Sequence, residues 1–169
     1  DLQRAEMEEG DFTGSTFSGA KLRNADMEKG TATGANFSNA DMRNADFDES
    51  GVKDTNFSNA DMRDITMKRA DLSGAVFESA KLNDANLERT SIQTTDFSSA
   101  NLTGADLDRT QAANASFIKA NLTSARMSHA DCSGARFNGA KLGKVTLQRT
   151  RLSGADLTGT SGLTQDMLS

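Results

Sequence analysis

Residues 70–74 read Ala-Asp-Leu-Ser-Gly, and residues 155–158 repeat the pattern as Ala-Asp-Leu-Thr. The order is small, polar, apolar, polar, polar, and an apolar residue recurs at every fifth position from Leu2 to Leu157 without insertion or deletion. Two residues before each apolar residue lies Ala, Gly, Ser or Thr, and only Ile65 and Val145 are larger. A period of five fits neither a helix nor a strand, whose periods are about 3.6 and about 2. The strict period therefore predicts a repeat architecture in which the chain turns a corner at every fifth residue.

Phenylalanine shows a second, longer period, because it recurs at every fourth pentapeptide. The central residues one pentapeptide before these phenylalanines form another series, and it contains the smallest central residues of the chain, among them Ala32, Ala112 and Cys132. This longer period follows only if four pentapeptides close one coil, so that each ring stacks on the ring of the next coil about 4.8 Å away. The sequence thus predicts a coil with four sides. Seven of the nine phenylalanines fall in this one series: Phe17, Phe37, Phe57, Phe77, Phe97, Phe117 and Phe137.

The repeat resembles the pentapeptide-repeat family, whose consensus is close to Ala-Asp/Asn-Leu-x-x, and the resemblance covers residues 1–160. It implies an all-β fold, a right-handed quadrilateral β-helix in which the apolar and the small residue both face inward. Thirty-two repeats on four sides make about eight coils and a rod about 38 Å long. We expect one solenoid domain over residues 1–160, followed by a C-terminal cap or tail over residues 161–169.

The two ends of the rod are expected to differ. After Leu157 the register fails at Gly162, and the tail offers Leu163, Met167 and Leu168 to cover the last coil as one short helical turn. The N-terminus has no comparable segment, so we expect a bare first coil, as in a truncated chain or one that stacks against another. An end-to-end or C-terminal homodimer is therefore left open.

Few side chains can carry chemistry. Cys132 lies in an apolar column and is expected to pack in the core. His129, the only histidine, lies at an outward position without partners at matching spacing, so we expect a solvated side chain. No phosphate-binding loop, zinc-ligand spacing or nucleophile motif is present. The sequence predicts no catalytic residue, no cofactor and no metal, and hence no enzyme.

Charge is distributed unevenly over the four predicted sides. The side centred on Met7, Met27 and their successors has 18 charged residues in 24 outward positions, whereas the phenylalanine side has five. Residues 1–80 carry a net charge of −7 and residues 81–169 a net charge of +2, which sum to −5. We take the carboxylates on the first three coils, set against only Lys29, as a candidate partner-binding surface, the acidic patch: Glu6, Glu8, Glu9, Asp26, Glu28, Asp46, Asp48 and Glu49.

A neighbouring side carries a ladder of opposite charges. Arg23, Arg43 and Arg63 lie beside Asp41 and Asp61, and we expect them to pair across coils. Exposed pairs of this kind contribute little each, about 0–1 kcal/mol. No aromatic residue is interleaved with the outward basic groups, which disfavours nucleic-acid binding.

These features favour a non-catalytic scaffold that binds an unknown protein partner through its outer faces. The resemblance also implies an alternative, because some pentapeptide-repeat proteins mimic DNA and inhibit or protect DNA gyrase, giving fluoroquinolone resistance. The mixed charge, the uninterrupted coils and the lack of a long C-terminal helix depart from that group. A regular Ser/Thr face for binding ice is a third interpretation.

The sequence has no apolar run of the length that crosses a bilayer as a helix, about 18 residues or more, so we expect no membrane span. It has neither a signal peptide nor an initiator methionine. We expect a soluble protein, in the cytoplasm rather than exported, with a mature exported form as the alternative.

Overall fold

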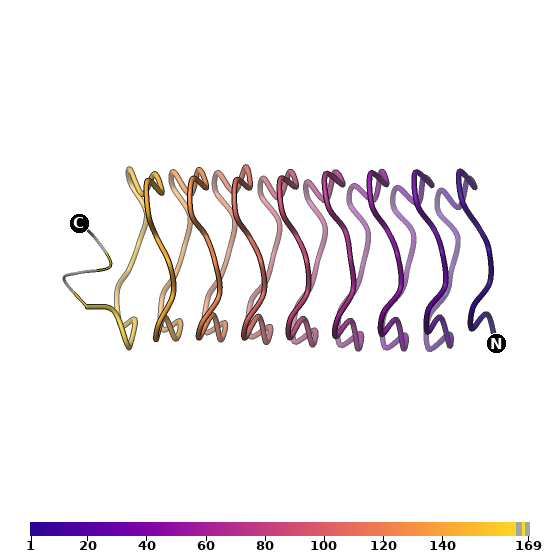
Figure 1. The fold of residues 1–169 in the computed structure, drawn as a ribbon, viewed down its shortest axis with the longest axis horizontal. Coiled ribbons are helices and arrows are strands. Elements are labelled where there is room, and N and C mark those ends of the chain that lie inside the picture. Colours follow the sequence, from indigo (N-terminus) through magenta and orange to yellow (C-terminus); the bar gives the residue numbers. More distant parts are fainter. Residues whose placement is uncertain (165–166, 168–169) are drawn as a thin grey trace.

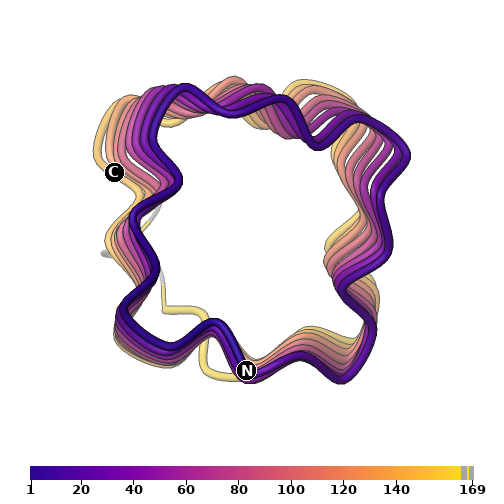
Figure 2. The same cartoon turned by 90° about the vertical axis from the view of Figure 1, so that its right-hand side faces the viewer.

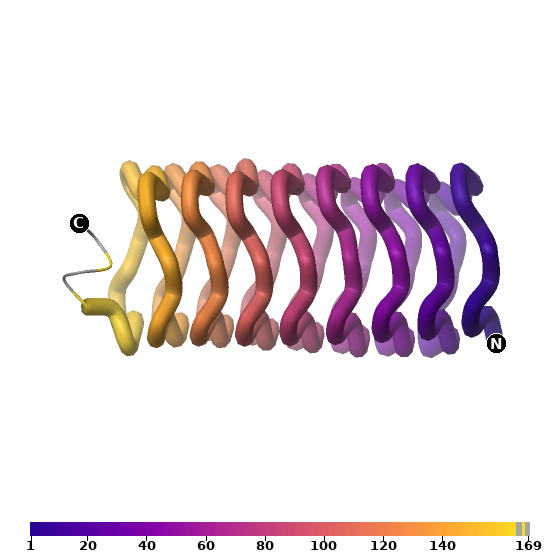
Figure 3. Tube along the Cα trace, viewed as in Figure 1, coloured from indigo at the N-terminus to yellow at the C-terminus, as the bar shows by residue number. Residues whose placement is uncertain are grey.

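The computed structural model describes residues 1–164 and 167. The chain winds as one continuous coil along a rod, with the N-terminus at one end (Figure 1). Seen along the axis, successive coils superpose as a rounded square, and the chain turns clockwise as it recedes from its N-terminus, so the coil is right-handed (Figure 2). The Cα trace shows the coils evenly stacked (Figure 3). We number the sides 1 to 4 by the central residues Leu2, Met7, Phe12 and Phe17 with their successors on later coils, and we number the coils 1 to 8 from the N-terminus.

Parallel β-bridges join each coil to the next, from Glu6 with Asp26 to Lys141 with Ser161. On side 2 the Met7 N–H donates to the Asp26 carbonyl at 2.8 Å, and the Asp26 N–H donates to the Ala5 carbonyl at 2.9 Å. The predicted coil of four pentapeptides is confirmed. Each side forms a single β-bridge with the next coil, because a turn follows within every pentapeptide. The described residues contain no strand longer than this bridge and no α-helix.

Each repeat ends in a four-residue turn, closed for example by the Ala5 N–H and the Leu2 carbonyl at 3.1 Å. The third residue of every turn has a positive φ, as type II turns require. Glycine, asparagine and aspartate tolerate this conformation best, since other residues crowd their Cβ against the backbone. The position nevertheless also holds Arg89 at φ 60° and the β-branched Thr94 at φ 56°.

The central and the small residues of each repeat form the core, and from coil 2 to coil 7 they are buried. The predicted phenylalanine stack is confirmed from Phe17 to Phe137, with neighbouring ring centroids 4.7–5.3 Å apart and interplanar angles of 3–13°. Phe47, from side 2, meets Phe37 edge-on at 5.8 Å. Stacked and edge-on rings are the two favourable arrangements of aromatic pairs.

Hydroxyl groups enter the core only where a carbonyl accepts their proton. Thr55 donates to the carbonyl of Ala32 at 2.7 Å, and Thr90 donates to that of Leu87 at 2.7 Å. No buried side-chain nitrogen or oxygen in the described part of the chain lacks a partner. Threonine can therefore replace alanine in the small column without the penalty of an unsatisfied polar group.

The rod is less completely covered at its ends than in its middle. Leu2, Met7, Phe12 and Phe17 of coil 1 are only partly buried. At the far end Leu163 and Met167 pack against the core, and the Met167 N–H donates to the Thr164 carbonyl at 3.1 Å. The rest of the predicted cap, including Leu168, lies outside the described residues, and the division into domains at residue 160 stays a prediction.

Gly162 ends the register for a steric reason. It occupies the place of the next central residue, with φ 81°, and a Cβ there would lie 2.6 Å from the backbone nitrogen of Gly143. Only glycine allows the chain to leave the coil by this close approach. Within residues 1–164 and 167, no helix has the length and apolar character that crossing a bilayer requires.

Phe77→Ala should lower the free energy of unfolding by about 3–5 kcal/mol, because it opens a ring-sized gap in a fully buried stack. Denaturant unfolding measures the loss. Phe17→Ala is the matched control, since that ring is partly exposed and should cost less. A loss below about 1 kcal/mol for Phe77→Ala would show that the ring lies outside the core.

Thr94→Gly should raise the free energy of unfolding by roughly 0.5–1 kcal/mol, since relief of a positive φ, about 1–2 kcal/mol, exceeds the entropy cost of glycine. Gln93→Gly, one position earlier on the same exposed turn, relieves no positive φ, brings the entropy cost, removes the hydrogen bond to Gln111 and should destabilise. Denaturant unfolding of both variants compares the two positions. Equal destabilisation by both changes would mean that Thr94 carries no strain.

Cys132 is buried as predicted, and burial, followed by the charge of Asp131, raises the pKa of its thiol to about 12. Iodoacetamide at pH 8 should therefore alkylate the native protein at least about 100-fold more slowly than the guanidinium-unfolded chain, since the thiolate is the nucleophile. The rate is followed by mass spectrometry. A native rate within about twofold of the unfolded rate would show an accessible thiol.

Candidate protein-binding surface

All eight residues of the acidic patch lie on side 2 of coils 1–3. Parallel bridges stack Glu6, Asp26 and Asp46 in one column on successive coils. The three glutamates of coil 1 and Glu49 are exposed, and Asp26, Glu28, Asp46 and Asp48 are half-buried. The carboxylates of the patch thus form two unbroken columns along the rod axis, and in the third outward column Lys29 separates Glu9 from Glu49.

Three of the eight carboxylates already have a cation beside them. Lys29 Nζ lies 2.7 Å from Glu28, Lys68 Nζ lies 3.1 Å from Asp48, and Arg69 Nη2 lies 2.6 Å from Glu49. Asp48 also accepts the backbone N–H of Lys68 at 2.8 Å and the hydroxyl of Thr66. Among the described residues no cation pairs with the other five: Glu6, Glu8, Glu9, Asp26 and Asp46.

The remaining carboxylates of side 2 contrast with these five. Glu88 lies 3.3 Å from Arg89, and Arg126 reaches both Asp106 at 3.2 Å and Asp108 at 2.6 Å. Every carboxylate on coils 5 and 6 of this side is therefore neutralised within the chain. The uncompensated negative charge of side 2 is confined to its N-terminal three coils.

The unpaired carboxylates perturb one another. The pKa of Glu8 is raised, chiefly by the negative charge of Asp26 and by the hydrogen bond between the two groups. The pKa of Asp46 is also raised, first by burial and then by the charges of Asp48, Asp26 and Glu28. Proximity of like charges disfavours the ionised form, so this surface would gain from a cation placed against it.

The arginine ladder on side 1 forms in the structure, but only Arg23–Asp41 and, at 3.8 Å, Arg43–Asp61 pair across coils as predicted, and the other pairs lie within one coil. Arg23 Nε contacts Asp41 at 2.8 Å across coils, Arg43 Nε contacts the same carboxylate at 2.8 Å, and Arg63 Nη2 lies 2.7 Å from Asp61. The hydrogen bond from Arg63 is the largest cause of a lowered pKa at Asp61.

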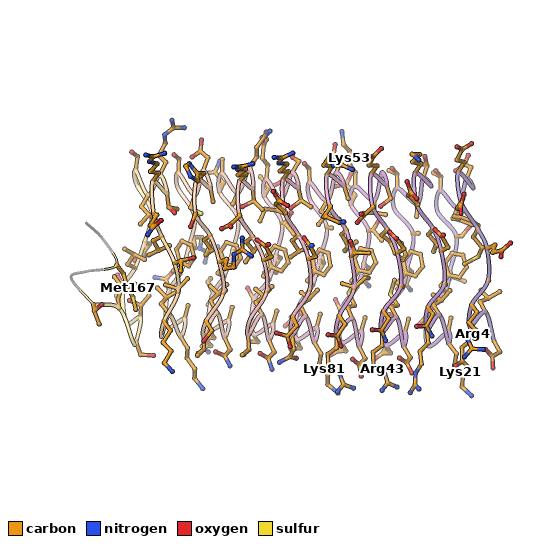
Figure 4. All side chains as sticks on the ribbon, viewed as in Figure 1. Arg4, Lys21, Arg43, Lys53, Lys81 and Met167 are labelled. Carbon is orange, nitrogen blue, oxygen red and sulfur yellow. The ribbon has the colours of Figure 1, made fainter. Side chains whose placement is uncertain are left out.

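The paired charges of side 1 are therefore concentrated on coils 2–4, at Arg23, Asp41, Arg43, Asp61 and Arg63. Arg4, Lys21, Arg43 and Lys81 project along one edge of the rod, the lower edge in Figure 4.

Sequence reasoning did not find the rule that decides which charges pair. The residue after a central position meets the residue before the central position of the next coil, as in Arg23–Asp41, Lys53–Asp71 and Asp108–Arg126. Other pairs join equivalent positions of successive coils, such as Glu49–Arg69. Oppositely charged residues at these two spacings would have predicted the pairs of Asp48 and Glu49, but not the pair of Glu28 with the adjacent Lys29.

No catalytic or metal-binding arrangement was found in the part of the chain that the structure describes. No group of three or more histidine, cysteine or carboxylate side chains there could hold a metal ion, and no pocket is enclosed. His129 lies at the turn position, with φ 61°. The arrangement on side 2 offers charge and hydrogen-bond acceptors at an open surface.

Comparison with known proteins agrees with this architecture. The profile of the pentapeptide repeat region matches residues 1–77 and 52–117, and that of pentapeptide repeats in eight copies matches residues 130–161. No curated protein sequence matches the chain.

Two solved structures share the fold. HetL, a pentapeptide repeat protein involved in heterocyst differentiation regulation in the cyanobacterium Nostoc, is 26% identical over 95% of this chain and 88% of its own, with a TM-score of 0.62. A trypsin-treated form of QnrB1, a plasmid-mediated fluoroquinolone resistance protein, is 21% identical over 99% of this chain and 88% of its own, with a TM-score of 0.64. With its unbroken pentapeptide register and these matches, the chain belongs to the pentapeptide-repeat family.

Proposed function

We propose that this chain is a non-catalytic scaffold that binds a basic segment of another protein through the unpaired carboxylates of the acidic patch. The observation that carries the proposal is the contrast within side 2. Five carboxylates of coils 1–3 have no cation among the described residues, whereas Glu88, Asp106 and Asp108 of the same side are paired. A partner with lysine or arginine side chains would supply the missing charge.

Such an interaction would depend on many weak contacts. One exposed ion pair contributes about 0–1 kcal/mol, so several cations of one partner would have to meet the patch together. Charge complementarity of this kind accelerates encounter and selects partners more than it raises affinity. Because a Debye length is about 8 Å at physiological ionic strength, salt should weaken the encounter strongly.

A second candidate is the DNA-mimicking role at gyrase. It is supported by the net charge of −7 in residues 1–80 and by the likeness of the fold to QnrB1, a fluoroquinolone resistance protein. In this alternative the acidic columns would stand for the phosphates of a DNA backbone. Inhibition of gyrase supercoiling by the purified chain is the property that separates it from the scaffold.

The test uses a patch variant, Glu6→Gln with Glu8→Gln and Asp26→Asn, and a matched control, Glu88→Gln with Asp106→Asn and Asp108→Asn. Both remove three carboxylates from side 2, and only the first set lacks cations in the described part of the chain. A partner captured from the source organism is identified, purified and titrated by calorimetry against wild type and both variants at two salt concentrations. Gyrase supercoiling is assayed beside it with the same three proteins.

The scaffold proposal expects the purified partner to bind wild type and the control alike, and to bind the patch variant at least about tenfold more weakly, with a loss of affinity at high salt. Partner binding that the patch variant leaves unchanged would overturn the choice of surface. Supercoiling inhibition by wild type that disappears in the patch variant would replace the scaffold by the gyrase role.

A further inference from the structure

The diagonal contact between successive coils is occupied by opposite charges in one part of side 2 and by like charges in another. Between coils 6 and 7, Asp108 meets Arg126 at 2.6 Å. The same position between coils 1 and 2 holds Glu8 and Asp26, and between coils 2 and 3 it holds Glu28 and Asp46. Two successive junctions at the N-terminal end of side 2 thus place carboxylate against carboxylate.

The charged groups around these two contacts do not compensate them fully. Lys29 lies against Glu28 at 2.7 Å and lowers the pKa of Glu8 by less than Asp26 raises it. On the side of coil 4, Lys68 and Arg69 are engaged with Asp48 and Glu49. The complete set of charged residues on this side of coils 1–3, with the corner residue Arg4, is Arg4, Glu6, Glu8, Glu9, Asp26, Glu28, Lys29, Asp46, Asp48 and Glu49.

The core also supports coil 1 less than it supports coil 2. Met7 and Phe17 of coil 1 are partly exposed, whereas Met27 and Phe37, which follow them in the same columns, are buried. Coils with few buried apolar contacts open locally at lower free energy than the rest of a fold. The Glu8–Asp26 contact therefore acts at a junction where one of the two coils is only partly buried.

We propose that the charge on Glu8, Asp26, Glu28 and Asp46 sets how firmly coil 1 is held to coil 2 and coil 2 to coil 3, so that the N-terminal end of side 2 is loosened at neutral pH and tightens when these carboxylates are neutralised. The proposal concerns a conformational device in the rod and is independent of the binding function. It predicts that acid strengthens the side 2 junctions of coils 1–3 relative to the side 2 junction of coils 6 and 7.

On side 3 of coil 1 hydrogen bonds from Thr13 lower the pKa of Asp11, whereas on side 2 the pKa values of Glu8 and Asp46 are raised in the folded chain. The contribution of Glu8 and Asp46 to stability is fully present below the ordinary pKa values and is lost as pH rises through the raised ones. Near the C-terminus, hydrogen bonds from Ser133 lower the pKa of Asp131, and hydrogen bonds from Thr158 and Asn138 lower that of Asp156 to about 2. Asp131 and Asp156 therefore stabilise the folded chain at pH values above their ordinary pKa, and this stabilisation is lost as pH falls through their lowered pKa values.

Hydrogen exchange at pH 7 tests the proposal on individual amides. The Met7 and Glu9 N–H groups donate to Asp26 and Glu28 across the first junction, and the Leu107 and Arg109 N–H groups donate to Arg126 and Ser128 across the sixth. In Glu8→Gln with Asp26→Asn, exchange at Met7 and Glu9 should slow roughly fivefold. Asparagine keeps the acceptor for the Glu28 N–H, which lies 3.0 Å from Asp26 Oδ1.

The matched control is Asp106→Asn with Asp108→Asn. It removes two carboxylates from the same columns but leaves Arg126 without its two ion-pair partners. Exchange at Leu107 and Arg109 should become faster in that variant. Exchange at Met7 and Glu9 that is unchanged or faster in the first variant would overturn the proposal.

The unmodified chain supplies a second measurement. After correction for the intrinsic pH dependence of exchange, the protection of Met7 and Glu9 relative to Leu107 and Arg109 should rise as pH falls from 7 toward about 4.5, where glutamate begins to protonate. Added salt at pH 7 should change the ratio in the same direction by screening the repulsion. A ratio that stays constant or falls on acidification would overturn the proposal.

Discussion

Hydrogen bonding along the rod axis requires each coil to repeat the one before it, residue for residue. The Met7 N–H finds the carbonyl of Asp26 only if one coil of four pentapeptides separates the two columns. The same spacing keeps Phe57 over Phe37 and Phe77 over Phe57. An inserted residue would shift both the hydrogen bonds and the rings of every later coil, as a register slip does in a sheet. The absence of insertions over residues 1–160 follows from this constraint.

The constraint also fixes the neighbours of every surface side chain. Because the hydrogen bonds hold equivalent residues of successive coils in line, a charged side chain on one coil has defined neighbours on the next coil. No loop interrupts the coils over residues 1–160 to place a different residue beside it. Arg23 and Asp41 meet for this reason, and so do Glu8 and Asp26. A favourable and an unfavourable contact arise from the same geometry. The surface of such a rod is therefore determined directly by the identities of the residues in its columns.

The residues that determine the core were readable from the sequence, because their spacing is the dominant pattern in the chain. The recurrence of phenylalanine at every fourth pentapeptide predicts the stack, and the loss of register at Gly162 predicts where the coil ends. The turn conformation was missed, since a positive φ at Arg89 or Thr94 has no sign in those side chains.

The acidic patch was predicted as one group because the sequence shows how many charged residues lie on each side but not which of them are in contact. Its division into paired and unpaired carboxylates needed the cross-coil contacts, which place Lys68 on Asp48 and leave Glu8 against Asp26. The edge-on ring of Phe47 was likewise invisible, because two different columns meet there.

The coil of four pentapeptides, rather than the single pentapeptide, is the structural unit in this account, and two deletions test this most directly. Removing residues 81–100 deletes one coil and leaves Phe77 to stack on Phe117. Removing residues 81–95 keeps the pentapeptide pattern but moves Phe97 and Phe117 from side 4 to side 1. Denaturant unfolding should show that the first variant stays folded, while the second loses several kcal/mol, on the order of 3–5 kcal/mol, because Phe77 no longer stacks on a ring and all four columns are mismatched at the new junction. A second variant as stable as the first would contradict the account.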